Sequence, residues 1–207
     1  MIAALFIYGE FLNGISMGNN VLANPAPLGL MGFGMTTILL NIHNAGFFPI
    51  ETAIVAMGIF YGGLAQVIAG ILEYRKGNTF GLTAFTSYGF FWIVLVGIWY
   101  LPVSSHTAPT DPVFLGIFLA LWGIFTAFMF IGTLKGNKVL QFVFGSLVVL
   151  FALLALGNIL GNKTLIRIAG FEGIICGASA FYLAMAEVLK EQFGRDVLPI
   201  GAPKDNH

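Results

Sequence analysis

The sequence predicts an all-α fold, namely a polytopic membrane protein with six transmembrane helices in each protomer. Of its 207 residues, 58% are hydrophobic and only 9% are charged, whereas a soluble domain has about 25% charged residues. Nine basic and nine acidic side chains cannot cover the surface of a soluble fold of this size, but lipid accepts apolar side chains. Six spans of about 20 residues each also fit this length and leave short loops.

Proline, glycine and charged residues divide the apolar stretches into six segments. The expected spans cover about residues 27–42, 51–74, 79–101, 112–134, 138–157 and 164–190. The first span follows Asn24-Pro25-Ala26-Pro27, where prolines are tolerated because the first N–H groups of a helix have no intrahelical partner. Residues 17–200 are therefore expected to form a single six-helix transmembrane domain.

The two ends of the chain are expected to lie outside this domain. Residues 1–16 are apolar but too short to span a bilayer, and they lack the basic region of a signal peptide. We interpret them as an N-terminal extension, either a helix lying on the membrane surface or the product of an upstream start. Residues 201–207 are short and polar and are expected to form a flexible tail.

The nine basic residues are unevenly distributed between the two sides of the predicted bundle. With the N-terminus inside, seven of them face the cytoplasm: Arg75, Lys76, Lys135, Lys138, Lys190, Arg195 and Lys204. Only Lys163 and Arg167 face the opposite side. Because cytoplasmic loops carry an excess of Lys and Arg, we expect both termini in the cytoplasm.

Pairs of glycines recur at helical spacing inside two spans. Gly58 and Gly62 lie in the second span, and Gly173 and Gly177 lie in the sixth. Small residues let helix backbones approach closely in lipid, where no hydrophobic effect drives helices together. We expect these pairs to mark tight helix contacts; the alternative is that they leave open volume along a pathway.

The composition excludes several classes of protein. Zero net charge argues against a nucleic-acid partner, and Cys176, the single cysteine, rules out a disulfide framework. The histidines at 43, 106 and 207 do not have the spacing of metal ligands. The sequence also lacks a recognisable nucleophile motif or phosphate-binding loop. We therefore expect neither an enzyme nor a metal or other cofactor.

Polar side chains within the spans are the candidates for function. In hydrocarbon an unpaired polar group is costly, so such residues face a partner helix or a wet cavity. Four residues that open the third span, Thr79, Thr83, Thr86 and Ser87, cluster on one side of a helix. A Thr or Ser can instead bond to its own helix, but the cluster favours a wet path. Gln66 lies in the second span. The candidates for substrate binding inside the spans are Thr36, Thr37, Asn41, Thr83, Thr86, Ser87 and Asn158.

A second kind of candidate site lies at the start of the first span. No Lys or Arg lies near the centre of any span, so an anion that crosses the protein meets hydroxyls, amides and helix N-termini. Free N–H groups and the helix dipole favour a carboxylate at a helix N-terminus. Asn24 and Pro25 are therefore predicted to contribute to substrate binding.

The heptapeptide Asn24-Pro25-Ala26-Pro27-Leu28-Gly29-Leu30 resembles the signature of the acetate uptake transporter family, and the similarity continues from about residue 17 to residue 200. It includes Leu72-Glu73-Tyr74, Gly77-Asn78-Thr79-Phe80-Gly81, Thr83-Ala84-Phe85, Ser87-Tyr88-Gly89 and Glu191-Gln192-Phe193-Gly194. On these residues the chain is identified as a member of that family.

This resemblance implies a bacterial inner-membrane transporter or channel for acetate, succinate and similar small carboxylates. It also implies a homo-hexamer in which each protomer has its own pathway. A narrow apolar constriction is implied at Phe33, Tyr88 and Leu147, and Ala180 resembles a residue that tunes substrate size. Without the resemblance, the sequence indicates only ordinary packing for Phe33 and Leu147.

Several mechanisms and functions remain open. A hydrophobic neck dewets and resists hydrated ions, but a small organic acid presents its methyl group to it. Passage of the neutral acid and coupling to protons are both compatible with such a neck, so a channel and a proton symporter are alternatives. A channel for ammonium or formate is another, although such channels usually carry intramembrane histidines. A membrane scaffold without transport is disfavoured by the polar cluster of the third span.

Overall fold

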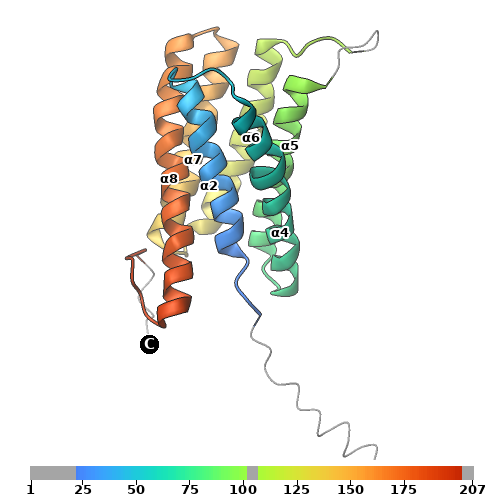
Figure 1. Cartoon of the computed structure of the whole chain (residues 1–207). Helices are drawn as coiled ribbons and strands as arrows, with labels where there is room; N and C mark the ends of the chain where they lie inside the picture. Colours follow the sequence, from blue (N-terminus) through green and yellow to red (C-terminus); the bar gives the residue numbers. More distant parts are fainter. Residues whose placement is uncertain (1–21, 102–106, 202–207) are drawn as a thin grey trace, which may run out of the picture.

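The computed structural model describes residues 22–101 and 107–201, which form a bundle of six membrane-length helical spans (Figure 1). The first span is α2 (Ala26–Asn44), and the second is built from α3 (Thr52–Ala56), η1 (Met57–Ala65) and α4 (Gln66–Arg75). The other four spans are α5 (Thr79–Tyr100), α6 (Pro112–Thr133), α7 (Lys138–Ile159) and α8 (Lys163–Phe193). The expected all-α, six-span fold is confirmed, and the span limits differ from those expected by at most three residues, at the end of α8. Residues 1–16, His106 and residues 202–207 lie outside the described residues.

Side-chain caps explain why four of the helices begin where they do. The side chains of Asn78, Asp111, Asn137 and Asn162 accept hydrogen bonds from first-turn N–H groups of α5, α6, α7 and α8, respectively. Such caps replace the partners that the first N–H groups of a helix lack. Because each cap directly follows a short turn or loop, the chain reverses within a few residues between α4 and α5, α6 and α7, and α7 and α8.

The second span contains a feature that the sequence analysis did not anticipate. Met57–Ala65 forms a π-helix of nine residues, a conformation that is rare and usually limited to one turn. Gly63 is required here, because a Cβ atom at this position would lie 2.7 Å from the carbonyl oxygen of Gly58. The widened helix brings Gly62 against Thr36 of α2.

The contact between α2 and α8 depends on small residues. A Cβ atom on Gly34 would lie 2.7 Å from the carbonyl oxygen of Gly177, and one on Gly177 would lie equally close to that of Gly34. Gly173 faces the side chain of Asn41 in the same way. The prediction that the glycine pairs mark tight helix contacts is therefore confirmed for this pair of helices.

These contacts place α2 in the interior of the bundle. It packs against α8 on one side and against η1 and α4 on the other, while α7 lies between α6 and α8. The two described ends of the chain, near residues 22 and 201, lie at the same end of the bundle (Figure 1). Large apolar side chains of α6 such as Phe114, Leu121 and Phe128 are more than 60% exposed, as expected for helices that face lipid.

Candidate functional site

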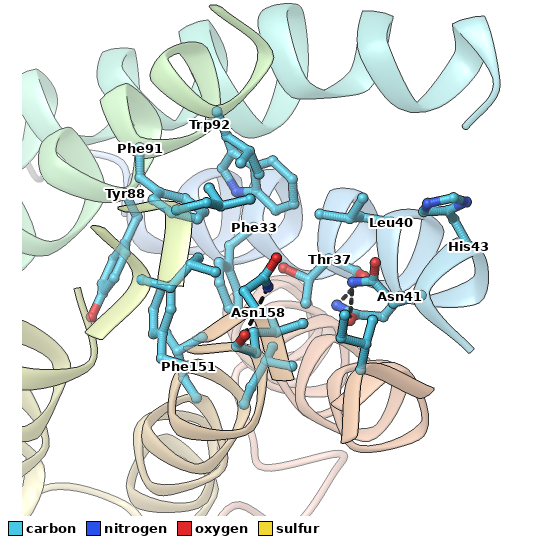
Figure 2. A pocket seen from close by; sticks show the side chains of 18 of the residues that line it. Phe33, Thr37, Leu40, Asn41, His43, Tyr88, Phe91, Trp92, Phe151 and Asn158 are labelled. Atoms are coloured by element: carbon cyan, nitrogen blue, oxygen red, sulfur yellow. Dashed lines mark hydrogen bonds between the residues drawn. The ribbon is translucent and has the colours of Figure 1, made fainter. Parts of the chain in front are cut away.

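A space inside the bundle, here called the Asn158 cavity, has a volume of about 270 Å³ and lies toward the end of the bundle where α7 ends. Its wall is mainly aromatic and aliphatic, and its polar residues are Thr37, Asn41, His43, Asn44 and Asn158 (Figure 2). No Asp, Glu, Lys or Arg is among the described residues that line it. The cavity therefore offers amides and a hydroxyl but no fixed charge.

The amides of the Asn158 cavity are held by local hydrogen bonds. Asn41 Nδ2 donates to the carbonyl oxygen of Thr37 (2.9 Å), and Asn158 Nδ2 donates to that of Leu154 (2.8 Å). Both bonds join residues four apart in one helix, and they fix the orientation of each amide. Asn44 Nδ2 donates to Asn41 Oδ1 (3.0 Å), so this part of α2 forms a polar wall.

A second space, here called the Asn24 cavity, lies at the other end of the bundle and has a volume of about 250 Å³. Its polar residues are Asn24, Glu73, Asn78 and Glu187. Asn24 Nδ2 donates to Glu187 Oε2 (2.8 Å), and Lys76 Nζ donates to Asn24 Oδ1 (2.8 Å). This cavity therefore contains two carboxyl groups, one of which is linked to a lysine through an asparagine.

The two carboxyl groups of the Asn24 cavity have different surroundings. Glu73 is fully buried, and its Oε2 accepts a hydrogen bond from Asn78 Nδ2 (2.7 Å). Its Oε1 has no hydrogen-bond partner among the described residues. Glu187 is only half-buried, and Asn24 provides its donor.

A third and much smaller space, here called the neck, lies between the two cavities and shares lining residues with each. Its volume of about 20 Å³ corresponds to roughly one water molecule. It shares Phe33, Tyr88 and Leu147 with the Asn158 cavity. It shares Leu30, Ala84, Phe85 and Phe144 with the Asn24 cavity. The three spaces thus follow one another through the bundle.

The neck is narrow because aromatic side chains fill it. The rings of Phe33 and Tyr88 lie with their centroids 6.1 Å apart, and both residues and Leu147 are less than 10% exposed. Thr126 Oγ1 donates to the carbonyl oxygen of Trp122 (2.7 Å), so the hydroxyl of Tyr88, 2.9 Å from Thr126 Oγ1, is the donor of that bond. This bond directs the hydroxyl of Tyr88 toward α6, and the ring of Tyr88 forms part of the wall of the neck.

Comparison with known proteins agrees with this arrangement. The profile of the GPR1/FUN34/yaaH family matches residues 8–198. The chain belongs to this family. The match begins nine residues before Met17, where the sequence resemblance was expected to start.

Two relatives and one solved structure are similar to the chain over most of its length. The succinate-acetate/proton symporter SatP of Escherichia coli is 69% identical over 185 residues, which are 89% of this chain and 98% of that protein. A solved structure described as the bacterial acetate channel SatP has a TM-score of 0.85 and 69% identity, covering 87% of this chain and 99% of that one. The ammonia transport outward protein 2 of Saccharomyces cerevisiae is 37% identical, covering 82% of this chain and 63% of that protein. These names describe transporters or channels and not enzymes, and the resemblance inferred from Asn24–Leu30 is confirmed.

The structure brings together only some of the residues that the sequence analysis selected. Asn24, Thr37, Asn41 and Asn158 line the two large cavities, and Phe33, Tyr88 and Leu147 line the neck. Ala180 lies behind α2, where it would be 3.4 Å from a Cβ atom on Gly34, next to Phe33.

Three predicted residues of α5 point elsewhere. Thr83 is exposed on the outside of the bundle, and Ser87 lines a shallow groove with Leu121, Trp122 and Phe125 of α6. Thr86 packs against Gly70 of α4. The turn of α5 that faces the pathway instead presents Ala84 and Tyr88, so the expected wet path along the threonines is not formed in the described residues.

The predicted anion site at the start of α2 has a different structure from the one expected. Ala26 N–H donates to Asn24 Oδ1 (3.2 Å), and the N–H groups of Leu28 and Gly29 donate to the carbonyl oxygen of Pro25 (3.1 and 3.3 Å). Proline at position 27 has no N–H. The expectation of free N–H groups at this terminus is therefore wrong, because the first turn satisfies its own donors. Pro25 and Thr36 are buried and do not line the three spaces.

Sequence analysis did not assign a site role to several residues that line the pathway. Gln66 is 1% exposed and is the polar residue of the neck, and its Oε1 has no partner among the described residues. Glu73 was noted only as part of the resemblance motif Leu72-Glu73-Tyr74, and Glu187 was not selected. The sequence could have indicated Gln66, Glu73 and Glu187 as pathway residues, because an ionisable or amide side chain within a span is costly unless it faces a partner or a cavity.

Proposed function

We propose that the chain carries acetate, and succinate with it, across the membrane through the Asn24 cavity, the neck and the Asn158 cavity. The observation that carries this proposal is the series of three spaces, which is formed by residues of one chain and is narrowest at an apolar point. The names of SatP, a succinate-acetate/proton symporter in one case and an acetate channel in the other, support carboxylates as the substrates.

The proposed constriction consists of Phe33, Tyr88 and Leu147. An apolar neck with room for about one water molecule resists a hydrated ion, because the ion must give up its water and finds no charged partner. A monocarboxylic acid of two carbons presents a methyl group to the same walls. Ala180 would act indirectly in this scheme, by fixing how closely α2 and its Phe33 approach the neck.

The polar residues of the two large cavities are the proposed contacts for the carboxyl group. Thr37, Asn41 and Asn158 would bind it in the Asn158 cavity, and Asn24 would bind it in the Asn24 cavity. Gln66 provides a polar contact in the neck itself. This proposal assigns no substrate contact to five predicted residues, because they do not line the pathway: Pro25, Thr36, Thr83, Thr86 and Ser87.

The chain is a multi-pass protein of a transporter family, and we further propose that it lies in a bacterial inner membrane with both termini in the cytoplasm. Six of the seven basic residues assigned to the cytoplasm are described, and they belong to the end of the bundle that contains the Asn24 cavity. This asymmetry supports the orientation. We also propose a homo-hexamer with one pathway per protomer, as the family resemblance implies.

Uptake by proteoliposomes tests the proposed function. The purified full-length chain, reconstituted in liposomes, should take up radiolabelled acetate faster than protein-free vesicles do, and unlabelled succinate should compete. An imposed pH gradient distinguishes proton-coupled uptake from simple conduction. Competition by ammonium or formate but not by succinate would favour the alternative substrates, since an ammonia transport protein is among the relatives. If none of these solutes is taken up, the proposed transport function is rejected, and a membrane scaffold without transport is the alternative.

A further inference from the structure

The buried carboxyl group of Glu73 has no role in the pathway as described so far. It lines the Asn24 cavity, is 0% exposed, and receives one hydrogen bond, from Asn78 Nδ2 to Oε2. Its Oε1 is buried without a partner among the described residues. A buried carboxylate that lacks partners for one oxygen is unfavourable, so this oxygen is available either to a proton or to a donor on the substrate.

The charged groups around Glu73 do not neutralise it directly. The neighbouring α8 contributes Glu187, whose charge repels that of Glu73, and Lys190. Lys76, after α4, is exposed and gives its hydrogen bond to Asn24. The faces of α2, α5 and α7 toward the cavity contribute only uncharged residues. A substrate carboxylate that enters this cavity therefore meets two carboxyl groups and one indirectly linked cation.

We propose that Glu73 takes up a proton when a carboxylate enters the Asn24 cavity and transfers it to the substrate in that cavity, before the substrate reaches the neck. Two carboxylates that share one site cannot both remain ionised without a large penalty, so binding of the anion favours protonation of Glu73. By linkage, protonation of Glu73 favours binding of the anion to the same degree. This proposal rests on the function proposed above and identifies the group that couples it to protons.

The proton balance of this scheme is complete. Glu73 accepts a proton from the solution on its side of the membrane and donates it as a hydrogen bond to the substrate carboxylate. The O–H bond on Glu73 then breaks while an O–H bond forms on the substrate, which crosses the apolar neck as the neutral acid. The carboxylate left on Glu73 accepts a new proton from the same side. One proton thus moves with each monocarboxylate.

The hydrogen-bond partners of the two carboxyl groups distinguish Glu73 from Glu187 as the proton carrier. Glu187 has a donor in Asn24, which in turn is bonded to Lys76. Glu73 is fully buried, and one of its oxygens lacks any such contact. Glu187→Gln is therefore a matched control, since it removes a carboxyl group from the same cavity.

The number of protons moved per acetate tests the proposal. Liposomes that contain the full-length chain and a trapped pH-sensitive dye receive radiolabelled acetate at equal pH on both sides, and signals from protein-free vesicles are subtracted. The parent and Glu187→Gln should move about one proton per acetate, as should Glu191→Gln, an exposed residue on α8. Glu73→Gln should lower the ratio at least tenfold, and Glu73→Asp, which keeps a carboxyl group, should retain it.

The fluxes of the Glu73 variants distinguish loss of the titratable group from loss of the fold. Loss of acetate flux in Glu73→Gln with retained flux and ratio in Glu73→Asp also supports the proposal, because the two variants then differ only by the titratable group. An unchanged ratio in Glu73→Gln overturns it, as does equal loss of flux in both variants. If the parent takes up no acetate above protein-free vesicles, the proposed function fails and not merely the assignment of Glu73.

Discussion

The Asn24 cavity and the Asn158 cavity have similar volumes, about 250 and 270 Å³, but opposite chemical character. The first contains two carboxyl groups and a network that reaches Lys76, whereas the second contains amides, a hydroxyl, a histidine and aromatic rings. An anion is therefore opposed by charge on one side of the neck and met by neutral dipoles on the other. In the proposed scheme, protonation controls occupancy at one end, while size and hydrogen bonding control it at the other.

The polar groups of the two cavities are also held in different ways. Asn24 and Glu187 are 163 residues apart in the chain, and Lys76 and Asn24 are 52 apart. In the other cavity, Asn41 and Asn158 each donate to a carbonyl four residues earlier in the same helix, and Asn41 also accepts a bond from Asn44 of that helix. A substitution in the Asn24 cavity thus breaks a connection between segments, while one in the Asn158 cavity changes a single side chain.

The largest effect on stability and uptake is expected at the contact of α2 with α8, because α2 contributes residues to both cavities. A Cβ atom on Gly34 would lie 2.7 Å from the carbonyl oxygen of Gly177 and 2.9 Å from the nitrogen of Phe181, both backbone atoms that cannot rotate away. Gly34→Val should therefore separate α2 from α8 and destabilise the fold by about 3 kcal/mol or more. A thermal shift in detergent should show a melting temperature lower by roughly 6–12 °C, with loss of uptake.

A glycine with space around it provides the control. A Cβ atom on Gly97 would lie 3.5 Å from Leu101 Cδ1, which is an ordinary contact. Gly97→Ala should leave uptake unchanged and keep or slightly raise the melting temperature, since alanine favours a helix over glycine. A parental melting temperature in Gly34→Val would contradict the close packing of α2 on α8, and with it the shared dependence of the two cavities.

The next largest effect is expected in the Asn24 cavity alone. Asn24→Ala removes the donor of Glu187 and the acceptor of Lys76, and hydrogen bonds to charged groups contribute about 1.5–3 kcal/mol. Acetate uptake at low concentration should fall about tenfold, with folding and assembly intact by size-exclusion chromatography. Lys76→Gln should have a smaller effect, because the lysine is exposed and exposed ion contacts contribute little. Unchanged uptake kinetics in Asn24→Ala at normal expression would leave Asn24 with a purely structural role, as a bridge between Lys76 and Glu187.

The fold could be predicted from the sequence because its signals are local. Apolar runs of membrane length, proline at helix starts and Asn or Asp before α5 to α8 fix the spans. The π-helix of Met57–Ala65 could not be predicted in this way. Its glycines are equally typical of close helix packing, and only the partner helices decide which backbone they adopt.

The site was less predictable because its contacts connect distant segments. No spacing in the sequence indicates that Asn24 meets Glu187 or that Thr126 holds the hydroxyl of Tyr88. The threonines of α5 do share helical sides, but helical periodicity does not reveal which side of a buried helix faces the cavity. Phe33, Tyr88 and Leu147 were selected by resemblance, and their placement at the neck makes their proposed role testable.

A smaller effect is expected in the neck, where the two cavities meet. Leu147→Val shortens a side chain that lines the 20 Å³ neck, so bulkier monocarboxylates such as lactate should pass more easily. One methylene in an apolar pocket changes selectivity by about 10–200-fold at most, and we expect a rise of about threefold to tenfold in the ratio of lactate to acetate uptake. The uptake values are normalised to the amount of protein in the membrane.

Leu150→Val is the matched control for the neck. Leu150 lies one turn away on α7, is equally buried, and lines the Asn158 cavity but not the neck. Both substitutions should cost a similar amount of stability, about 0.5–1.5 kcal/mol, but only Leu147→Val should change the ratio. An equal change in both variants, or none in Leu147→Val, would remove Leu147 from the constriction.

The smallest effect is expected in the Asn158 cavity, where the polar groups are locally held. Asn158→Ala removes a hydrogen bond to the carbonyl oxygen of Leu154, a bond within one helix whose loss costs about 1 kcal/mol or less. Acetate uptake should fall only about twofold to fivefold, less than in Asn24→Ala. Because the neck separates the two asparagines, the double variant should show the product of the two single effects, as expected for distant sites without shared partners. Uptake assays of the two single variants and the double variant measure this directly. A double variant no worse than Asn24→Ala would mean that the two cavities act as one coupled site, and the contrast between them would then be one of composition and not of function.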